Sequence, residues 1–297
     1  YTCFIPLFVQ ERFLNHRDEA RKASQTLLNS SGGSAGGAAA LGAGGDAERY
    51  DAYHMHVGCL FADASGFTAL TERFAAKPDG AEGMLTLLNA FFGELIDVIL
   101  ANGGDIVKFA GDAVLIIWPV KGSVTPFTKG EKAAGSGNSS PVMSPAGKKQ
   151  KGGGEGEGEG GDSGAPPETL KQMRVETLKA CACAMELLAV VEEYNNSPEY
   201  LQRLKERSPK VHALRLDNPD VKLGLHIGVA AGRLTCCHVG GVFSRWECVL
   251  TGPPMKDIAI AEPAATTGEV VVAPYAWALV ENDVEGVVRQ VKEAAGL

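Results

Sequence analysis

The sequence has no cluster of positive charge and no long apolar run. Its 297 residues include 28 Lys and Arg against 36 Asp and Glu, which gives a net charge of −8. The basic residues are scattered, whereas a nucleic-acid-binding surface usually needs them gathered on one face. No apolar stretch approaches the roughly 18 residues of a membrane-spanning helix. We therefore expect a protein that binds no nucleic acid and has no transmembrane segment in this fragment.

A secretion signal and paired metal-binding cysteines are also missing. The opening residues YTCFIPLFV lack a basic leader, so we expect a cytoplasmic location, and the first residue, Tyr1, suggests a fragment of a longer protein. The seven cysteines are odd in number and include no CxxC pair, which predicts reduced thiols. We interpret the pairs Cys181 with Cys183 and Cys236 with Cys237 as core residues rather than ligands.

The remaining composition is that of a globular domain interrupted by low-complexity segments. Hydrophobic residues make up 45% of the chain, and 15 of the 37 glycines lie in two tracts, 31–45 and 151–165. We predict a helical lead-in over 1–29, a low-complexity linker over 30–45, a domain over 50–282 and a C-terminal tail over 283–297. A disordered insertion, 121–167, interrupts the domain because its composition cannot bury enough apolar surface to fold.

Hydrophobic periodicity predicts a mixture of helices and strands in the domain. The expected helices are Thr68–Phe74, Met84–Leu100, Glu168–Tyr194 and a short one after Gly252. The expected strands are His54–Ala62, ending at Asp63; the hairpin Ile106–Phe109 with Ala113–Trp118; a second hairpin, Val221–Ala230 with Arg233–Gly240; Trp246–Leu250; and Val270–Ala273. This order lacks strict alternation of strand and helix, so we predict an α+β fold with an antiparallel-rich sheet.

Two segments carry the chemistry, FADASGFT at 61–68 and KFAGD at 108–112. In the first, Asp63 follows a strand, and a glycine turn leads into a helix whose free N–H groups favour an anion such as a triphosphate. In the second, Asp112 follows Gly111 at a hairpin tip. If the strands are neighbours, the two carboxylates can share Mg²⁺. Taken singly, an aspartate placed like Asp63 is commonly a helix cap and one placed like Asp112 is commonly a turn residue, but the pair in this order is more specific.

Longer stretches resemble the class III nucleotidyl cyclase catalytic domain. FADASGFTALTERF followed by GGDIVKFAGDAVLIIW is most similar to the first catalytic domain of soluble, bicarbonate-responsive adenylyl cyclases. LGLHIGVAAGRL and VLTGPPMKDIAIAEPAA fit the same family, as does the opening YTCFIPLFVQERFL. The resemblance covers about 53–118 and 168–282, and it implies a ferredoxin-like βαββαβ core.

The resemblance also implies an activity and a site. Class III cyclases convert ATP to 3′,5′-cyclic AMP and pyrophosphate at a dimer interface, using two Mg²⁺ ions for which Mn²⁺ can substitute. The matching metal ligands, and the catalytic residues, are Asp63 and Asp112, with the Ala64 carbonyl as a further metal ligand. The matching phosphate-binding positions are Ser65, Gly66, Phe67, Thr68 and Gly111. Lys108 matches a lysine that contacts the purine or a regulatory anion.

Departures from the family pattern predict that a second cyclase domain is needed. The Asn and Arg that complete a self-sufficient site align with Lys256 and Ile260, and the purine-reading position aligns with Val249. The arginine that binds bicarbonate with Lys108 aligns with Ala259, so bicarbonate activation is not expected. Two alternatives stay open: a non-catalytic regulatory module and, more weakly, a guanylate cyclase.

We interpret three histidines of the domain as structural residues. His226 lies in an alternating strand with nothing in the sequence to orient it as a base. His54 and His56 share one strand face but have no third ligand nearby in the sequence, so zinc is not expected there.

Overall fold

Two long antiparallel strands form the centre of the sheet. The computed structural model describes residues 51–126, 165–240 and 246–288. Strand β1 (Asp51–Ser65) pairs along its whole length with β5 (Gly224–Gly240). The main strand order is β2-β3-β1-β5-β6, where β2 is Asp105–Ala110, β3 is Ala113–Pro119 and β6 is Trp246–Thr251. Two short strands join this sheet: β4 (Thr125–Pro126) pairs with β1, and β7 (Val270–Val272) pairs parallel with β5.

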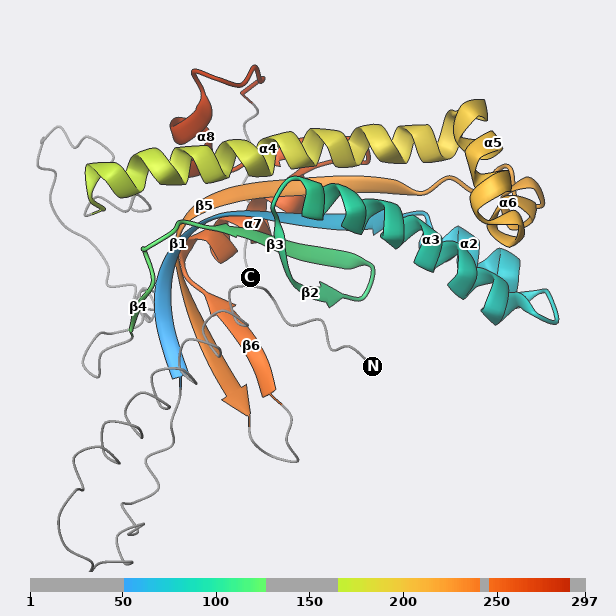
Figure 1. Cartoon of the computed structure of the whole chain (residues 1–297), viewed down its shortest axis with the longest axis horizontal. Coiled ribbons are helices and arrows are strands. Elements are labelled where there is room, and N and C mark those ends of the chain that lie inside the picture. The colour runs from blue at the N-terminus through green and yellow to red at the C-terminus, as the bar shows by residue number, and fades with distance from the viewer. Residues whose placement is uncertain (1–50, 127–164, 241–245, 289–297) are drawn as a thin grey trace, which may run out of the picture.

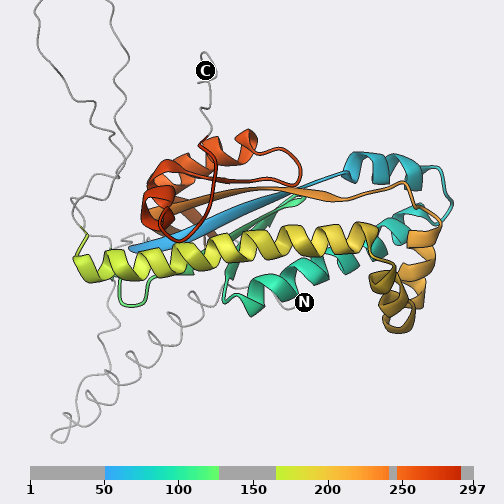
Figure 2. The ribbon, with the colours of Figure 1, turned by 90° about the horizontal axis from the view of Figure 1, so that it is seen from above.

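One face of the sheet is covered by helices. Helix α4 (Pro167–Asn196) runs along the sheet beside α3 (Gly80–Ala101), as Figures 1 and 2 show. Alternate β1 residues, including Leu60 and Ala62, are buried beneath these helices. The same core includes residues of α2 (Phe67–Ala75), α5 (Pro198–Arg207), α6 (Pro209–Leu216) and α8 (Pro274–Val280). Gly58 permits the close fit of α4, because a Cβ atom there would lie 2.9 Å from the Glu176 carbonyl oxygen.

Helix α3 is long and apolar enough, by length and composition alone, to cross a membrane. In this fold one of its faces packs in the core. Its buried residues include Leu87, Phe91, Leu95 and Ile99, which recur every four positions and therefore form one stripe. The helix is therefore part of the hydrophobic core.

The opposite face of the sheet carries α7 (Pro253–Ala264). Residues of β1 on this face, including Met55, Val57 and Cys59, share a second core with Ile258 and Ala261 of the helix. Gly228 of β5 allows the contact, since a Cβ atom there would lie 2.8 Å from the Glu262 main-chain nitrogen. The ends of β1, β5 and β6 that lie away from α6 curve out from beneath α4 (Figure 1). The functional residues described below occupy this face.

The α+β prediction is confirmed, and so is the antiparallel-rich sheet with its βαββαβ core. The prediction of a second hairpin is wrong: residues 224–230 and 233–240 belong to the single strand β5, which begins at Gly224. Between the two predicted segments, Gly232 has φ 139° and the strand continues there opposite Val57. β1 is long enough to offer hydrogen-bond partners to both segments, so the chain does not reverse.

Several predicted regions lie at or beyond the limits of the described residues. The lead-in 1–29 and the linker 30–45 lie outside them, as does most of the insertion 121–167. At the edges of that insertion, β4 and the first residue of α4 are ordered. Near the predicted tail, Asp283 accepts a hydrogen bond of 2.9 Å from Nε of Arg174 in α4. The sequence did not predict α5, α6, α8 or β4.

Candidate metal and nucleotide site

Asp63 lies within β1, where three strands run side by side. It stands opposite Ala113 of β3 and opposite His226 of β5. The expectation that the strand ends at Asp63 is wrong, because β5 begins at Gly224 and pairs with β1 as far as Ser65. The Asp63 side chain is 29% exposed. It is held by a sheet rather than by a loop, yet water and ions can reach it.

Asp112 lies beside Asp63 although 49 positions separate them in the sequence. It occupies the β2–β3 turn, directly before the residue that pairs with Asp63. Burial is the largest cause that raises the pKa of Asp63, and the charge of Asp112 raises it further. The His226 side chain and the Ala64 main-chain hydrogen bond act in the opposite direction. The structure therefore brings together the two carboxylates that the sequence singled out.

This pair of carboxylates suits a hard divalent cation. Each ionised group raises the free energy of the other, and a cation between them would remove that repulsion. Mg²⁺ takes oxygen ligands and usually binds through one or two carboxylates together with substrate phosphates. Asp63 and Asp112 fit this requirement, with Ala64 buried next to Asp63 in the same strand.

The turn after β1 is shaped to leave main-chain N–H groups open. Gly66 has φ 95°, and a Cβ atom there would lie 2.4 Å from the Lys222 carbonyl oxygen, so glycine is required. Helix α2 begins directly after it without a side-chain cap. Such a helix start favours a phosphate because its first N–H groups lack intrahelical acceptors. At the neighbouring hairpin, Gly111 (φ 69°) leaves open space where a side chain would stand.

The other residues of the predicted phosphate segment have different surroundings. The Phe67 ring stacks on Phe92, with centroids 6.0 Å apart, so only its main chain is available to a phosphate. Ser65 Oγ forms a hydrogen bond of 3.1 Å with Thr267 Oγ1. Thr68 is exposed on the first turn of α2.

A histidine and a glutamate that the sequence analysis did not assign to the site lie against Asp63. His226 Nε2 is 2.8 Å from Glu262 Oε1 and 3.3 Å from Asp63 Oδ2. Nothing in the sequence orients His226, and in the structure Glu262 of α7 does so. No sequence pattern signals this contact, since it depends on the β1–β5 register and on the close approach of α7 at Gly228.

The positions expected to face a second domain are exposed, but Val249, which stands opposite Cys237, projects from the face of the sheet opposite to the one that α7 covers. Lys108 is exposed on β2, opposite Leu115, which belongs to the second core on the α7 side of the sheet. Three residues of α7, Lys256, Ala259 and Ile260, are exposed and share one helix face. Val249 on β6 is 44% exposed.

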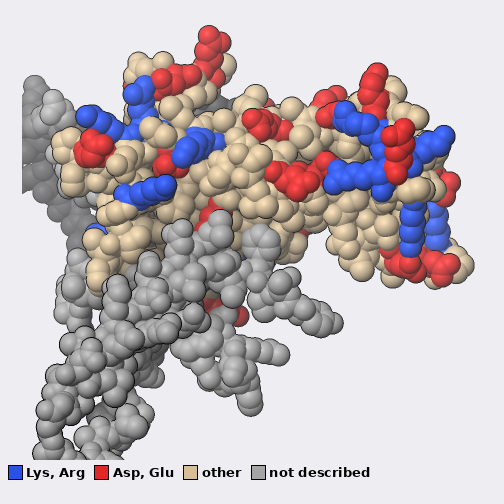
Figure 3. All heavy atoms as spheres, viewed as in Figure 1, with Lys and Arg blue, Asp and Glu red and all other residues tan. Residues whose placement is uncertain are grey.

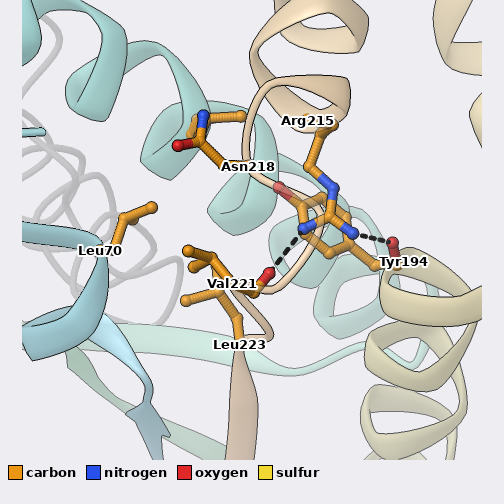
Figure 4. A pocket seen from close by; sticks show the side chains of 7 residues that line it. Leu70, Tyr194, Arg215, Asn218, Val221 and Leu223 are labelled. Atoms are coloured by element: carbon orange, nitrogen blue, oxygen red, sulfur yellow. Dashed lines mark hydrogen bonds between the residues drawn. The ribbon is translucent and has the colours of Figure 1, made fainter. Parts of the chain in front are cut away.

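A small cavity elsewhere does not suit a nucleotide. It lies among α2, α3, α4 and α6, is lined by residues such as Leu70 and Leu223, and offers about 10 Å³, close to the space of one water molecule (Figure 4). Arg215 closes it by donating to the carbonyl oxygens of Tyr194 and Val221 at 2.9 Å and 3.1 Å. On the face shown in Figure 3, acidic and basic side chains intermingle over the helices.

Comparisons with known proteins bear on the class of protein that the chain resembles. The resemblance to class III nucleotidyl cyclase domains is confirmed by matches to adenylate cyclases. The chain is similar to adenylate cyclase type 10 of Rattus norvegicus, with 45% identity over 65 residues, and equally to the Homo sapiens protein of that name. The match spans 21% of this chain and only 4% of the length of each relative.

Solved structures of cyclases are similar to most of the chain, at low sequence identity. The adenylyl cyclase CyaB from P. aeruginosa is 16% identical, with 79% of this chain and 85% of that chain covered and a TM-score of 0.47. The guanylyl cyclase Cya2 is 18% identical, with 82% and 87% covered and a TM-score of 0.49. No protein-family model matches the chain.

Proposed function

We propose that this chain is the metal-binding half of an adenylate cyclase, which converts ATP to 3′,5′-cyclic AMP and pyrophosphate together with a second cyclase domain. The observation that carries the proposal is the convergence of Asp63 and Asp112 beside the uncapped start of α2. A purely regulatory module has no chemical need for two carboxylates that raise each other's free energy. Their retention favours catalysis over the regulatory alternative.

Each part of the site has a separate task in this reaction. Asp63 and Asp112 would hold Mg²⁺, which supplies positive charge next to the ribose 3′ hydroxyl and the phosphates. The main-chain N–H groups at the start of α2 would bind phosphate oxygens and fix their position. Glu262 fixes the orientation of His226, whose ring supports the ionised form of Asp63.

The second domain would supply what α7 lacks. An arginine at the position of Ile260 would stabilise charge on the transferring phosphate, but isoleucine has no polar group. Loss of such a group typically costs 10²–10³-fold in rate, or about 3–4 kcal/mol. ATP rather than GTP is proposed because the sequence matches are to adenylate cyclases.

The test is reconstitution with a complementary cyclase domain that carries the missing Asn and Arg. Cyclic AMP formation from ATP with Mg²⁺ is expected in the mixture, and Asp63→Asn or Asp112→Asn should reduce it at least about 100-fold, because a neutral amide holds Mg²⁺ poorly. Asp97→Asn, on the exposed surface of α3, is the matched control and should retain activity. Preferential use of GTP would favour the guanylate alternative, and no turnover of either nucleotide would favour the regulatory one.

A further inference from the structure

A second cluster of potential ligands lies on the same sheet face, toward the other end of β5. It consists of Cys236 and His238 on β5 and Cys248 on β6, whose ligand atoms all lie within 4.8 Å of one another. Cys248 stands directly opposite His238 in the β5–β6 pairing, and Cys236 is the diagonal neighbour of Cys248. The three side chains therefore project from one side of two paired strands. The mechanism proposed above does not use them.

The spacing of these atoms is close to that of a zinc site. Cys236 Sγ lies 3.1 Å from Cys248 Sγ and 3.9 Å from His238 Nε2. Tetrahedral zinc, with bonds of about 2.3 Å to sulfur and 2.0–2.1 Å to nitrogen, separates two sulfurs by about 3.8 Å and a sulfur from a nitrogen by about 3.6 Å. Each separation differs from the structure by less than about 1 Å. Small side-chain rotations would therefore complete the arrangement.

The surroundings favour a thiolate-binding cation. Cys236 is fully buried and His238 is 7% exposed, while Cys248 is half-buried on β6, which ends the main strand order. The Tyr53 hydroxyl lies 3.3 Å from His238 Nε2, where its oxygen or a water molecule can complete four-coordination. Two sulfurs and an imidazole select Zn²⁺ over Mg²⁺, which prefers oxygen.

We propose that Cys236, His238 and Cys248 form a zinc site, separate from the magnesium site at Asp63. Bound zinc would tie β6 to β5 immediately before α7 begins. The hydrogen bond between the two thiols lowers the pKa of Cys248 and raises that of Cys236, whose burial raises it further, so zinc would have to displace the Cys236 proton on binding. Cys236 belongs to the second core, as the sequence predicted, and the proposal adds a ligand role to it.

The experiment titrates the reduced 297-residue chain with Co²⁺ as a spectroscopic substitute for zinc. We expect one Co²⁺ per chain at this site, a sulfur-to-cobalt charge-transfer absorption, displacement by equimolar Zn²⁺ and no displacement by excess Mg²⁺. Cys248→Ala and His238→Asn should weaken binding at least 10-fold. Cys237→Ser is the matched control, because Cys237 is adjacent in sequence but lies on the opposite face of β5, and it should bind as the wild type does.

A second measurement keeps the test decisive if a variant does not fold. In the wild type, Zn²⁺ should protect Cys248 from alkylation, as read by peptide mass analysis, while Cys237 reacts equally with and without zinc. The proposal is overturned if the reduced chain gives no sulfur-to-cobalt band, if Cys248→Ala binds Co²⁺ as tightly as Cys237→Ser, or if zinc leaves Cys248 unprotected. None of these readouts requires ATP or a second domain, so they fail or succeed independently of the cyclase proposal.

Discussion

At one end of the sheet face, His226 meets Asp63 and Glu262; toward the other, His238 meets Cys236 and Cys248. Both groups combine residues of β5 with residues of a neighbouring element. The first group has two carboxylates and side chains that are 18–29% exposed. The second has two thiols and, in Cys236 and His238, buried ligands. Strand pairing decides which residues meet, and the donor atoms then decide which cation is preferred.

The two ends would also contribute differently to the proposed cyclase reaction. The Asp63 end has the groups needed to hold a metal ion. The β6–α7 side presents Val249, Lys256 and Ile260, where a complete cyclase site needs groups that stabilise the transition state. This asymmetry means that two copies of the chain would assemble two metal-binding halves and no complementary half.

The largest expected effect comes from supplying the missing groups to α7. Lys256→Asn combined with Ile260→Arg should raise cyclic AMP formation by the chain alone about 100-fold, because a guanidinium then faces the phosphates bound by a second copy. Both positions are exposed, so the fold should tolerate the change. Leu216→Arg, at an equally exposed apolar position on α6, is the control and should give no gain. High activity of the unmodified chain alone would contradict the asymmetry.

A smaller effect is expected from an anion on the β6–α7 side. Bicarbonate is strongly hydrated and needs charge-assisted hydrogen bonds, of which Lys108 alone offers one flexible group. We expect little stimulation of the reconstituted wild type and a several-fold response after Ala259→Arg. The measurement is a bicarbonate titration at fixed pH and ionic strength. Strong stimulation of the wild type would show that the anion binds elsewhere.

At the Asp63 end, loss of His226 should change the pH profile. The His226 charge lowers the pKa of Asp63, so His226→Gln should raise that pKa further. Because Asp63 must be ionised to bind Mg²⁺, the acidic limb of kcat/KM in the reconstituted enzyme should move to higher pH, by less than about one unit. His212→Gln on α6 should leave the limb unchanged. A shift of the acidic limb to lower pH would contradict the inference that His226 lowers the pKa of Asp63.

The smallest expected effect is on the stability of the metal-free chain. The raised pKa of Asp63 means that the folded state holds this proton more tightly than the unfolded state does. Ionisation therefore lowers stability as pH rises from the ordinary value of 3.8 through the raised one, and the loss persists above it. Asp63→Asn should raise the neutral-pH Tm by no more than about 3 °C, since solvent screens this partly exposed group. The difference should vanish below the ordinary pKa, and an equal difference at every pH would exclude this cause.

The sequence predicted Asp63 and Asp112 because each belongs to a local motif that is readable without a structure. Contacts that depend on register could not be predicted in this way. His226 meets Glu262 only because α7 packs against β5, and Cys236 meets Cys248 across a pairing that joins residues 12 positions apart. A second hairpin was predicted where there is one strand, because local composition does not show that β1 is long enough to pair with both segments.

Gly58 and Gly228 lie on opposite faces of the sheet, each where the main chain of a helix touches a strand. A methyl group at Gly58 would push on α4, and one at Gly228 would push on α7 at Glu262, the residue that holds His226. Among inherited variants of this protein, Gly228→Ala would therefore impair the site as the loss of a site residue does, although it changes no charge and adds only one carbon atom. A severity ranking based on chemical similarity between amino acids would place it among the harmless ones.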